Sequence, residues 1–293
     1  MHPLKRSGSQ PGKPVRGASC DYPMPDDDRT LTPSNRPPGQ TWAPKAAGGD
    51  TTAISARLKT VARNMWVLHD TSLLPGVTEE LFQPQQLQHQ GAVTATRTGR
   101  RTTYFLRFSG LDLVLRHYWR GGWVARLSKD RYLWTGFSRT RPVKEWLLLR
   151  DLVELRLPVP RPIAARVMRH GLRYSGDLVT VTIPESMPLD EQIRRKLDTP
   201  ALWRRIGSTV ARFHNAGAWH ADLNVRNILI GPDNEVWLID WDRGRLGVRR
   251  GLEGNLERLR RSLDKWPETR ERGRAGWGDL VGGYQDTRKL NDG

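Results

Sequence analysis

HADLNVRNILI (residues 220–230) and VWLIDWD (residues 236–242) carry the strongest structural signal in this chain. They contain Asp222, then Asn227 five positions later, then Asp240 eighteen positions after the first Asp. The apolar runs at 227–230 and 235–239 read as short strands, and the Gly-Pro-Asp-Asn between them predicts a tight hairpin. Residues 199–214, just before, repeat apolar side chains at helical spacing and predict an amphipathic helix. A helix followed by a loop and a hairpin would bring the three polar side chains close together at one end of the hairpin.

This order of polar groups suits phosphoryl transfer. Such a reaction needs a carboxylate that orients and deprotonates the attacking hydroxyl, and hard oxygen ligands for the Mg²⁺ that bridges the nucleotide phosphates. We assign Asp222 to the first task and Asn227 and Asp240 to the second. His220 joins Asp222 in the catalytic set, as the residue that orders the loop by hydrogen bonding. An isolated Asp is most often a cap or a surface ion pair, but the joint pattern indicates kinase-like ancestry.

The preceding part of the chain predicts a small antiparallel sheet with one helix. Strand-like runs at 102–108 and 111–119 flank Ser109-Gly110, which indicates a hairpin, and two more strands are expected at 163–171 and 177–183. Residues 142–156 predict a helix that opens with a proline. The chain is therefore expected to have an α+β, protein-kinase-like bilobal fold. We divide it into a disordered basic Pro/Gly-rich leader at 1–63, an N-lobe at 64–186 and a mainly helical C-lobe at 187–293.

The N-lobe should supply a cation for the nucleotide phosphates and a carboxylate that holds the cation. Arg116 on the second strand is the candidate cation, and Glu145 on the helix is the candidate carboxylate. The alternative interpretation of Arg116 is a solvated strand residue without a role in binding. Arg replaces the Lys usual in kinases, which is not a neutral exchange. Three candidate phosphate loops, at Thr98-Gly99, Ser109-Gly110 and Gly121-Gly122, match poorly, and the loop stays unassigned. The polar and aromatic runs at 117–122 and 129–132 suit either a grip on an anionic sugar or phosphate, or an edge strand.

Charge is the clearest compositional feature. Lys and Arg number 48 against 31 Asp and Glu, which leaves a net charge of +17. Nucleic acid, an anionic membrane face and a phosphorylated substrate all fit such a surface. The one cysteine, Cys20, can form no internal disulfide, and no apolar run reaches the roughly 18 residues of a spanning helix. We expect a reducing compartment, and we expect part of the leader to derive from an upstream start codon.

A further helix is predicted at 251–266. Its leucines and Trp266 repeat at steps of three and four, while Arg258, Arg260, Arg261 and Lys265 lie away from that face. Packing in the core of the C-lobe is favoured over a direct membrane contact. Both can hold, because basic residues attract anionic lipid.

Four stretches together resemble the Kdo (3-deoxy-D-manno-octulosonic acid) kinases of the lipopolysaccharide kinase family. They are residues 220–229 and 238–244, shared with many kinase-like folds, and the more particular VLRHYWRGG (114–122) and LPVPRPIA (157–164). The similarity runs from about Val93 to about Trp266. It implies transfer of the γ-phosphate of ATP, with Mg²⁺, to the 4-hydroxyl of the Kdo sugar of Kdo-lipid IV(A), in lipopolysaccharide core synthesis.

The resemblance also implies a setting and roles. The setting is peripheral, on the anionic cytoplasmic side of a Gram-negative inner membrane. By matching position, Asp222 is the catalytic Asp, and Asn227 and Asp240 are the metal ligands. The absence of a multi-glycine loop fits the family's divergence from protein kinases.

Two rivals remain open at this point. The catalytic loop alone also permits a kinase of another small hydroxyl compound, similar to aminoglycoside phosphotransferases. A catalytically inactive, basic nucleic-acid-binding protein on a kinase scaffold would account for the charge and for the interleaved Arg and Trp. The complete Asp/Asn/Asp set argues against such decay, so nucleic acid is the less favoured partner.

Overall fold

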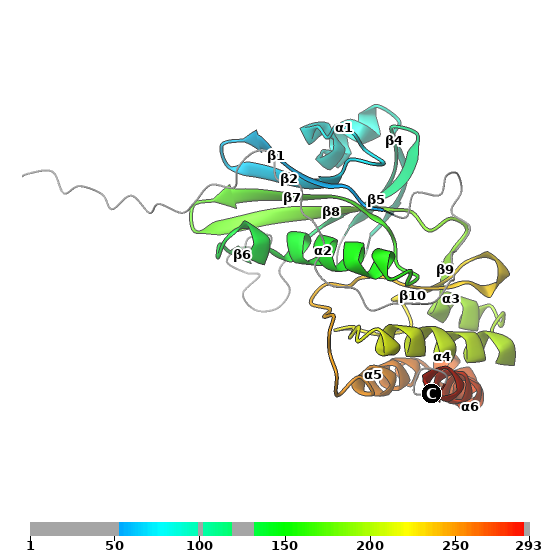
Figure 1. Ribbon diagram of the computed structural model, residues 1–293. Coiled ribbons are helices and arrows are strands. Elements are labelled where there is room, and N and C mark those ends of the chain that lie inside the picture. Colours follow the sequence, from blue (N-terminus) through cyan, green and yellow to red (C-terminus); the bar gives the residue numbers. More distant parts are fainter. Residues whose placement is uncertain (1–52, 99–101, 119–131, 290–293) are drawn as a thin grey trace, which may run out of the picture.

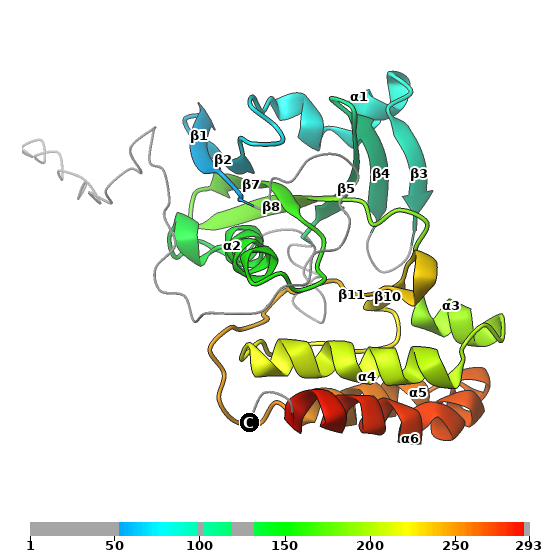
Figure 2. The same cartoon turned by 45° about the vertical axis from the view of Figure 1, so that its right-hand side comes forward.

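The computed structural model describes residues 53–98, 102–118 and 132–289. A large antiparallel sheet forms one lobe, and a small sheet with several helices forms the other (Figure 1). Helix α2 (Arg141–Glu154) lies between the large sheet and the second lobe in both views (Figure 2). This is an α+β, kinase-like architecture, as the sequence predicted.

The large sheet has the strand order β1-β2-β7-β8-β5-β4-β3, with β6 paired to β8. Its strands are β1 (Ala56–Ala62), β2 (Met65–Asp70), β3 (Val93–Arg97), β4 (Thr103–Phe108), β5 (Leu111–His117), β6 (Tyr132–Leu133), β7 (Pro162–His170) and β8 (Arg173–Val181). Ser109 and Gly110 both have positive φ, which suits the turn of the predicted β4–β5 hairpin. Short helices η1 (Glu79–Phe82) and α1 (Pro84–His89) precede β3, and η3 (Phe137–Arg139) precedes α2.

The boundary expected for the leader is too late in the chain. Strand β1 lies inside residues 1–63 and pairs with β2, which in turn pairs with β7. Ala56 and Leu58 are buried while Arg57 and Lys59 are exposed, the period of a strand with one face on the core. The pattern is short and half polar, so composition alone did not separate it from the leader. Residues 1–52 lie outside the described part.

Helix α2 forms because Pro142 occupies its first turn and its apolar residues face inward. Trp146, Leu149 and Leu152 are fully buried in a core cluster that also includes residues of β7 and α4. The helix therefore holds its polar residues at fixed positions between the lobes.

The second lobe contains a sheet of order β11-β10-β9. Its strands are β9 (Met187–Pro188), β10 (Ile228–Ile230) and β11 (Val236–Leu238). The last two form the predicted hairpin, closed by η4 (Pro232–Asn234). The helices are α3 (Leu189–Arg194), α4 (Pro200–Asn215), α5 (Gly254–Leu263) and α6 (Pro267–Lys289). Leu259 and Leu263 of α5 are buried in the core, as the core interpretation of this helix expected. None of the described helices is both long and apolar enough to span a bilayer.

Helix α6 was not predicted, and its contact with α4 explains why. A Cβ on Gly207 would lie 1.8 Å from the carbonyl oxygen of Leu280, and one on Gly283 would lie 2.0 Å from that of Arg204. The two backbones touch where side chains are absent. Glycines disfavour helix by about 1 kcal/mol each relative to Ala, so the residues that permit this packing hide the helix from a propensity argument.

Candidate active site

The loop after α4 presents Asp222 through bonds of its own backbone. The Asn227 side chain donates from Nδ2 to the backbone oxygen of Asp222 at 2.8 Å, and the Asn224 side chain donates to the same oxygen at 2.9 Å. Asn224 also accepts from the backbone NH of Arg226 at 2.9 Å. The loop is thereby fixed from within, and the sequence interval between Asp222 and Asn227 is bridged by a direct contact.

His220 joins this loop to the strand that leads to Asp240. Its Nε2 donates to the backbone oxygen of Ile239 at 2.9 Å, and its Nδ1 accepts from the backbone NH of Asp222 at 3.1 Å. Burial lowers the pKa of His220, so the neutral imidazole with hydrogen on Nε2 fits both bonds. Because both ring nitrogens of His220 are engaged in hydrogen bonds, the arrangement suits the loop-ordering role predicted for His220.

A buried polar chain supports His220 from below. Asn255 at the start of α5 accepts from the backbone NH of His220 at 3.1 Å and donates to its carbonyl oxygen at 2.6 Å. His214 of α4 lies 3.2 Å from the Asn255 oxygen through Nε2 and 2.9 Å from the Tyr284 hydroxyl through Nδ1. Burial lowers the pKa of His214 to about 4. His214 thus packs and supports, as the sequence indicated, and α6 contributes to the foundation of the loop through Tyr284.

Asp222 itself has an ionic partner that the sequence did not reveal. Arg258 of α5 donates to its Oδ1 from Nε at 2.8 Å and from Nη2 at 2.5 Å. No described residue donates to Oδ2. The carboxylate therefore keeps one oxygen toward solvent, where a substrate hydroxyl can reach it. Helical spacing predicted that Arg258 lies on the exposed face of its helix, and it does. That spacing could not indicate that this face lies against the loop that carries Asp222.

Arg116 and Glu145, the predicted N-lobe pair, are in contact. Arg116 donates from Nη2 to Oε1 of Glu145 and from Nη1 to Oδ1 of Asp240. The Tyr118 hydroxyl donates to the other Glu145 oxygen. Burial opposes the charge of Arg116, but Asp240 and Glu145 outweigh it and hold the pKa of Arg116 well above its ordinary value. Burial raises the pKa of Glu145, against the influence of Arg116. The structure therefore brings the N-lobe cation directly to Asp240.

Asn227 and Asp240 fit a magnesium ion by the chemistry of their donors. The backbone NH of Ile239 donates to the carbonyl oxygen of Asn227 at 3.0 Å, so the backbone just before Asp240 lies beside Asn227. Asp240 lies two residues beyond β11 and has a left-handed backbone, with φ of 62°. The described residues contain no cluster of three or more His, Cys, Asp or Glu side chains suited to a metal. Magnesium in nucleotide sites takes one or two carboxylates together with substrate phosphates, so a carboxylate and an amide oxygen suffice.

Strand register excludes one of the three candidate phosphate loops. Arg116 pairs with Thr103, whereas Leu111 pairs with Phe108 at the other end of the same hairpin. Ser109-Gly110 is therefore about 20 Å from Arg116, at roughly 3.4 Å a residue, and is excluded. The β3–β4 connection begins at the Arg116 end, but residues 99–101 lie outside the described part, as does Gly121-Gly122.

The polar run after β5 is only partly described. His117 lies 2.8 Å from Asp177 through Nδ1, and Tyr118 is buried against Glu145. Residues 119–131 lie outside the described part. Of the second run, Tyr132 accepts a hydrogen bond from Arg141 at 2.8 Å.

A second link between the lobes was missed from the sequence. Arg141, in the first turn of α2, donates from Nε to Oδ1 of Asp242 at 2.8 Å and forms an ion pair with its other oxygen. The signal was available in part, since Asp242 stands two positions after Asp240. Its partner, 101 residues earlier, could not be read from spacing.

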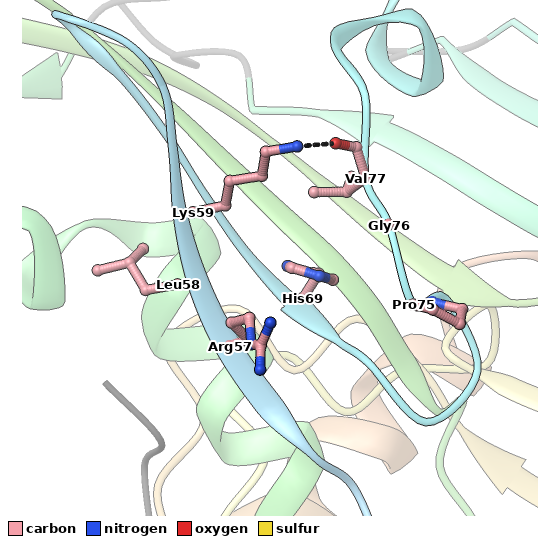
Figure 3. Close-up of a pocket in the computed structure, with 7 residues that line it drawn as sticks. All are labelled: Arg57, Leu58, Lys59, His69, Pro75, Gly76 and Val77. Carbon is pink, nitrogen blue, oxygen red and sulfur yellow. Dashed lines mark hydrogen bonds between the residues drawn. The ribbon is translucent and has the colours of Figure 1, made fainter. Parts of the chain in front are cut away.

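A separate cavity of about 400 Å³ lies against the β1–β2 hairpin (Figure 3). Arg57, Lys59 and His69 line it, opposite the turn from Pro75 to Val77. Lys59 donates from Nζ to the backbone oxygen of Val77 at 3.0 Å. None of the residues that line this cavity belongs to the cluster around Asp222, Asn227 and Asp240.

Comparison with known proteins gives a consistent result. Residues 84–284 match the model of the lipopolysaccharide kinase (Kdo/WaaP) family. Proteins named 3-deoxy-D-manno-octulosonic acid kinase are similar. One from Vibrio parahaemolyticus is 38% identical over 203 residues, 69% of this chain and 85% of the relative. One from Xanthomonas axonopodis pv. citri is 41% identical over 208 residues, 70% and 83% of the two chains. One from Stenotrophomonas maltophilia is 43% identical over 204 residues, 68% and 80%.

The family match extends beyond the predicted range at both ends, to α1 and to α6, and strands β1 and β2 precede it. The resemblance inferred from the motifs is thus confirmed. The chain belongs to the lipopolysaccharide kinase (Kdo/WaaP) family and is an ATP-dependent kinase.

Proposed function

We propose that this kinase phosphorylates the 4-hydroxyl of the Kdo residue of Kdo-lipid IV(A) in lipopolysaccharide core synthesis. The names of its relatives support the sugar acid as acceptor. The observation that carries the chemistry is the half-exposed carboxylate of Asp222, with Oδ1 held by Arg258 and Oδ2 open among the described residues. A large lipid-linked acceptor can approach a base placed at the surface, but not one placed in a closed cavity.

In the proposed reaction Asp222 orients the sugar hydroxyl and accepts its proton at Oδ2. The hydroxyl oxygen forms a bond to the γ-phosphorus of ATP, the bond from that phosphorus to the bridging oxygen breaks, and ADP leaves. Little covalent chemistry falls to the protein, so position and charge carry the catalysis. Arg116 supplies a fixed positive charge beside Asp240, held in place by Glu145.

We propose that Asn227 and Asp240 hold the magnesium ion. When bound, the ion neutralises charge on the nucleotide phosphates and fixes their orientation. The backbone hydrogen bond from Ile239 to Asn227 supports this proposal, because it holds Asn227 beside the residue that precedes Asp240.

We further propose that the enzyme works peripherally on the cytoplasmic side of the inner membrane. The support is chemical: a net charge of +17 favours an anionic leaflet, and the proposed acceptor carries acidic groups on a lipid. Basic residues near such a surface contribute about 1 kcal/mol each, screened by salt.

The test is transfer of labelled γ-phosphate from ATP to Kdo-lipid IV(A), with and without Mg²⁺, for the native enzyme and Asp222→Ala. Labelled lipid that requires both Mg²⁺ and Asp222 supports the proposal. Label on a free aminoglycoside and none on the Kdo lipid would assign the enzyme to the alternative class of acceptor. Steeply salt-dependent binding of nucleic acid without any phosphate transfer would overturn the proposal altogether.

A further inference from the structure

Arg258 is bound to the catalytic carboxylate by one edge of its guanidinium only. Nε and Nη2 form that edge, and both donate to Oδ1 of Asp222. The second edge, formed by Nη1 and the remaining hydrogen of Nη2, donates to no described residue, and the side chain is 46% exposed. A planar two-donor edge beside the base is left directed at solvent.

Three other arginines of α5 and of the loop that carries Asp222 have contacts of their own. On α5, Arg260 lies over the Trp277 ring at 5.6 Å and Arg261 pairs with Glu257 at 3.8 Å. Within the catalytic loop, Arg226 donates to Asp190 at 3.2 Å. In the described part of the chain, Arg258 is the cation that contacts Asp222.

We propose that the outer edge of Arg258 binds the carboxylate of the acceptor sugar and so selects a sugar acid. This inference rests on the proposed function. In Kdo the carboxyl group is carried by ring carbon 2 and the reacting hydroxyl by ring carbon 4, with one ring carbon between them. A hydroxyl directed at Oδ2 of Asp222 therefore brings the carboxylate of the same ring to the neighbourhood of Arg258.

Charge also favours this arrangement. A sugar carboxylate that approaches Asp222 meets a second carboxylate, and like charges at short range repel. Arg258 neutralises Asp222 on one edge and presents two parallel donors on the other, the geometry that suits a carboxylate. A neutral sugar with the same hydroxyl would offer that second edge only neutral acceptors, which bind a guanidinium more weakly than a carboxylate does.

The test compares two acceptors and four enzymes. The acceptors are Kdo-lipid IV(A) and the same lipid with the Kdo carboxyl reduced to a primary alcohol. The enzymes are the native protein, Arg258→Ala, Arg258→Lys and Arg261→Ala, which changes an exposed Arg one turn away on the same helix. The quantity measured is the ratio of kcat/KM for the acid acceptor to kcat/KM for the alcohol acceptor. Hydrolysis of ATP by water and the KM for ATP are followed in parallel.

The native enzyme and Arg261→Ala are expected to prefer the acid by about 10- to 150-fold, which corresponds to the range for hydrogen bonds to a charged group. Arg258→Ala is expected to bring the ratio close to one, mainly through the KM for the acid. Arg258→Lys should restore part of the ratio, because it keeps the charge and loses the planar edge. The KM for ATP should be unchanged throughout.

The ratio separates this role from a merely supporting one. If Arg258 only positions Asp222, Arg258→Ala lowers kcat/KM equally for the acid and the alcohol acceptor. The ratio then stays at its native value, which overturns the inference. A native enzyme that phosphorylates acid and alcohol equally overturns it too, while leaving the proposed function intact. A native enzyme that phosphorylates neither lipid refutes the proposed function and the inference together.

Discussion

Arg116 of β5 and Asp240, 124 residues later, form an ion pair across the boundary between the two lobes. The pair joins the large sheet to the end of the small hairpin, and Glu145 of α2 holds the same guanidinium from the other side. The cation of the N-lobe and the predicted metal ligand of the C-lobe are thus one connected unit.

Arg116→Met should lower kcat/KM for ATP by about 100-fold or more, equivalent to about 2.7 kcal/mol of transition-state stabilisation. Two carboxylates would lose the cation between them, one of them buried. Steady-state kinetics with ATP varied checks this. Arg107→Ala is the control, because its pair with Asp112 is exposed on the same hairpin. Equal effects of the two substitutions would contradict the role of Arg116.

Asp222→Asn should lower turnover by about 10²- to 10⁴-fold, the usual contribution of a general base, with ATP binding retained. The amide keeps the shape of the side chain but cannot accept the hydroxyl proton. Single-turnover transfer and equilibrium nucleotide binding measure the two effects separately. Asp286→Asn, at an exposed pair with Arg204, should leave both unchanged. Near-native turnover of Asp222→Asn would remove it from the base's role.

Asp240→Asn should shift the Mg²⁺ dependence of activity to much higher concentration. Loss of the carboxylate charge removes the stronger of the two proposed oxygen ligands. A titration with Mg²⁺ at saturating ATP checks this, with Asp233→Asn on the outer turn of the hairpin as control. Unchanged Mg²⁺ dependence would exclude Asp240 from the metal site.

The protein should lose stability as the pH falls from about 6.5 to about 4, because the pKa of His214 is lowered to about 4 by burial. The unfolded chain binds the proton in that window and the folded chain does not. The loss from this residue is at most about 3 kcal/mol. Urea unfolding at pH 7 and pH 4.5 measures it. His214→Gln, which keeps a donor and an acceptor, should be less sensitive to pH; a slope equal to that of the native protein would count against His214 as the source.

Gly283→Ala should destabilise the protein by about 2–3 kcal/mol, because the new methyl group would lie 2.0 Å from the Arg204 carbonyl oxygen and force α4 and α6 apart. Gly278→Ala on the same helix meets nothing within 4 Å and should stabilise by up to about 1 kcal/mol. Thermal unfolding of both variants gives the comparison. A tolerated Gly283→Ala would mean that the helices are less closely packed than the structure shows.

The predicted site residues that the structure places near one another are those with a local sequence signature, and their roles stay predictions. Asp222, Asn227 and Asp240 stand on a helix, loop and hairpin with clear apolar patterns, and those elements were predicted within a few residues. Arg116 and Glu145 were predicted as a pair because kinase chemistry requires a cation and a carboxylate that holds it. The structure shows that the two side chains are in contact.

The residues that sequence reasoning missed act across long intervals. Arg258 and Arg141 each meet an Asp that spacing along the chain cannot indicate, since 36 and 101 residues separate the partners. Helix α6 was missed because its glycines, required for the backbone contact with α4, weaken every local helix signal. Strand β1 was missed because a short strand with one polar face resembles a leader in composition.

The buried chain from Tyr284 through His214 and Asn255 to His220 has a consequence for biosynthesis. The loop that carries Asp222 is complete in sequence long before Tyr284 is translated, yet it rests on a helix made afterwards. A nascent chain that ends before Tyr284 therefore contains the predicted site residues but lacks part of the buried hydrogen-bond chain that supports their loop. We therefore expect phosphate transfer to begin only after α6 has emerged from the ribosome and packed against α4.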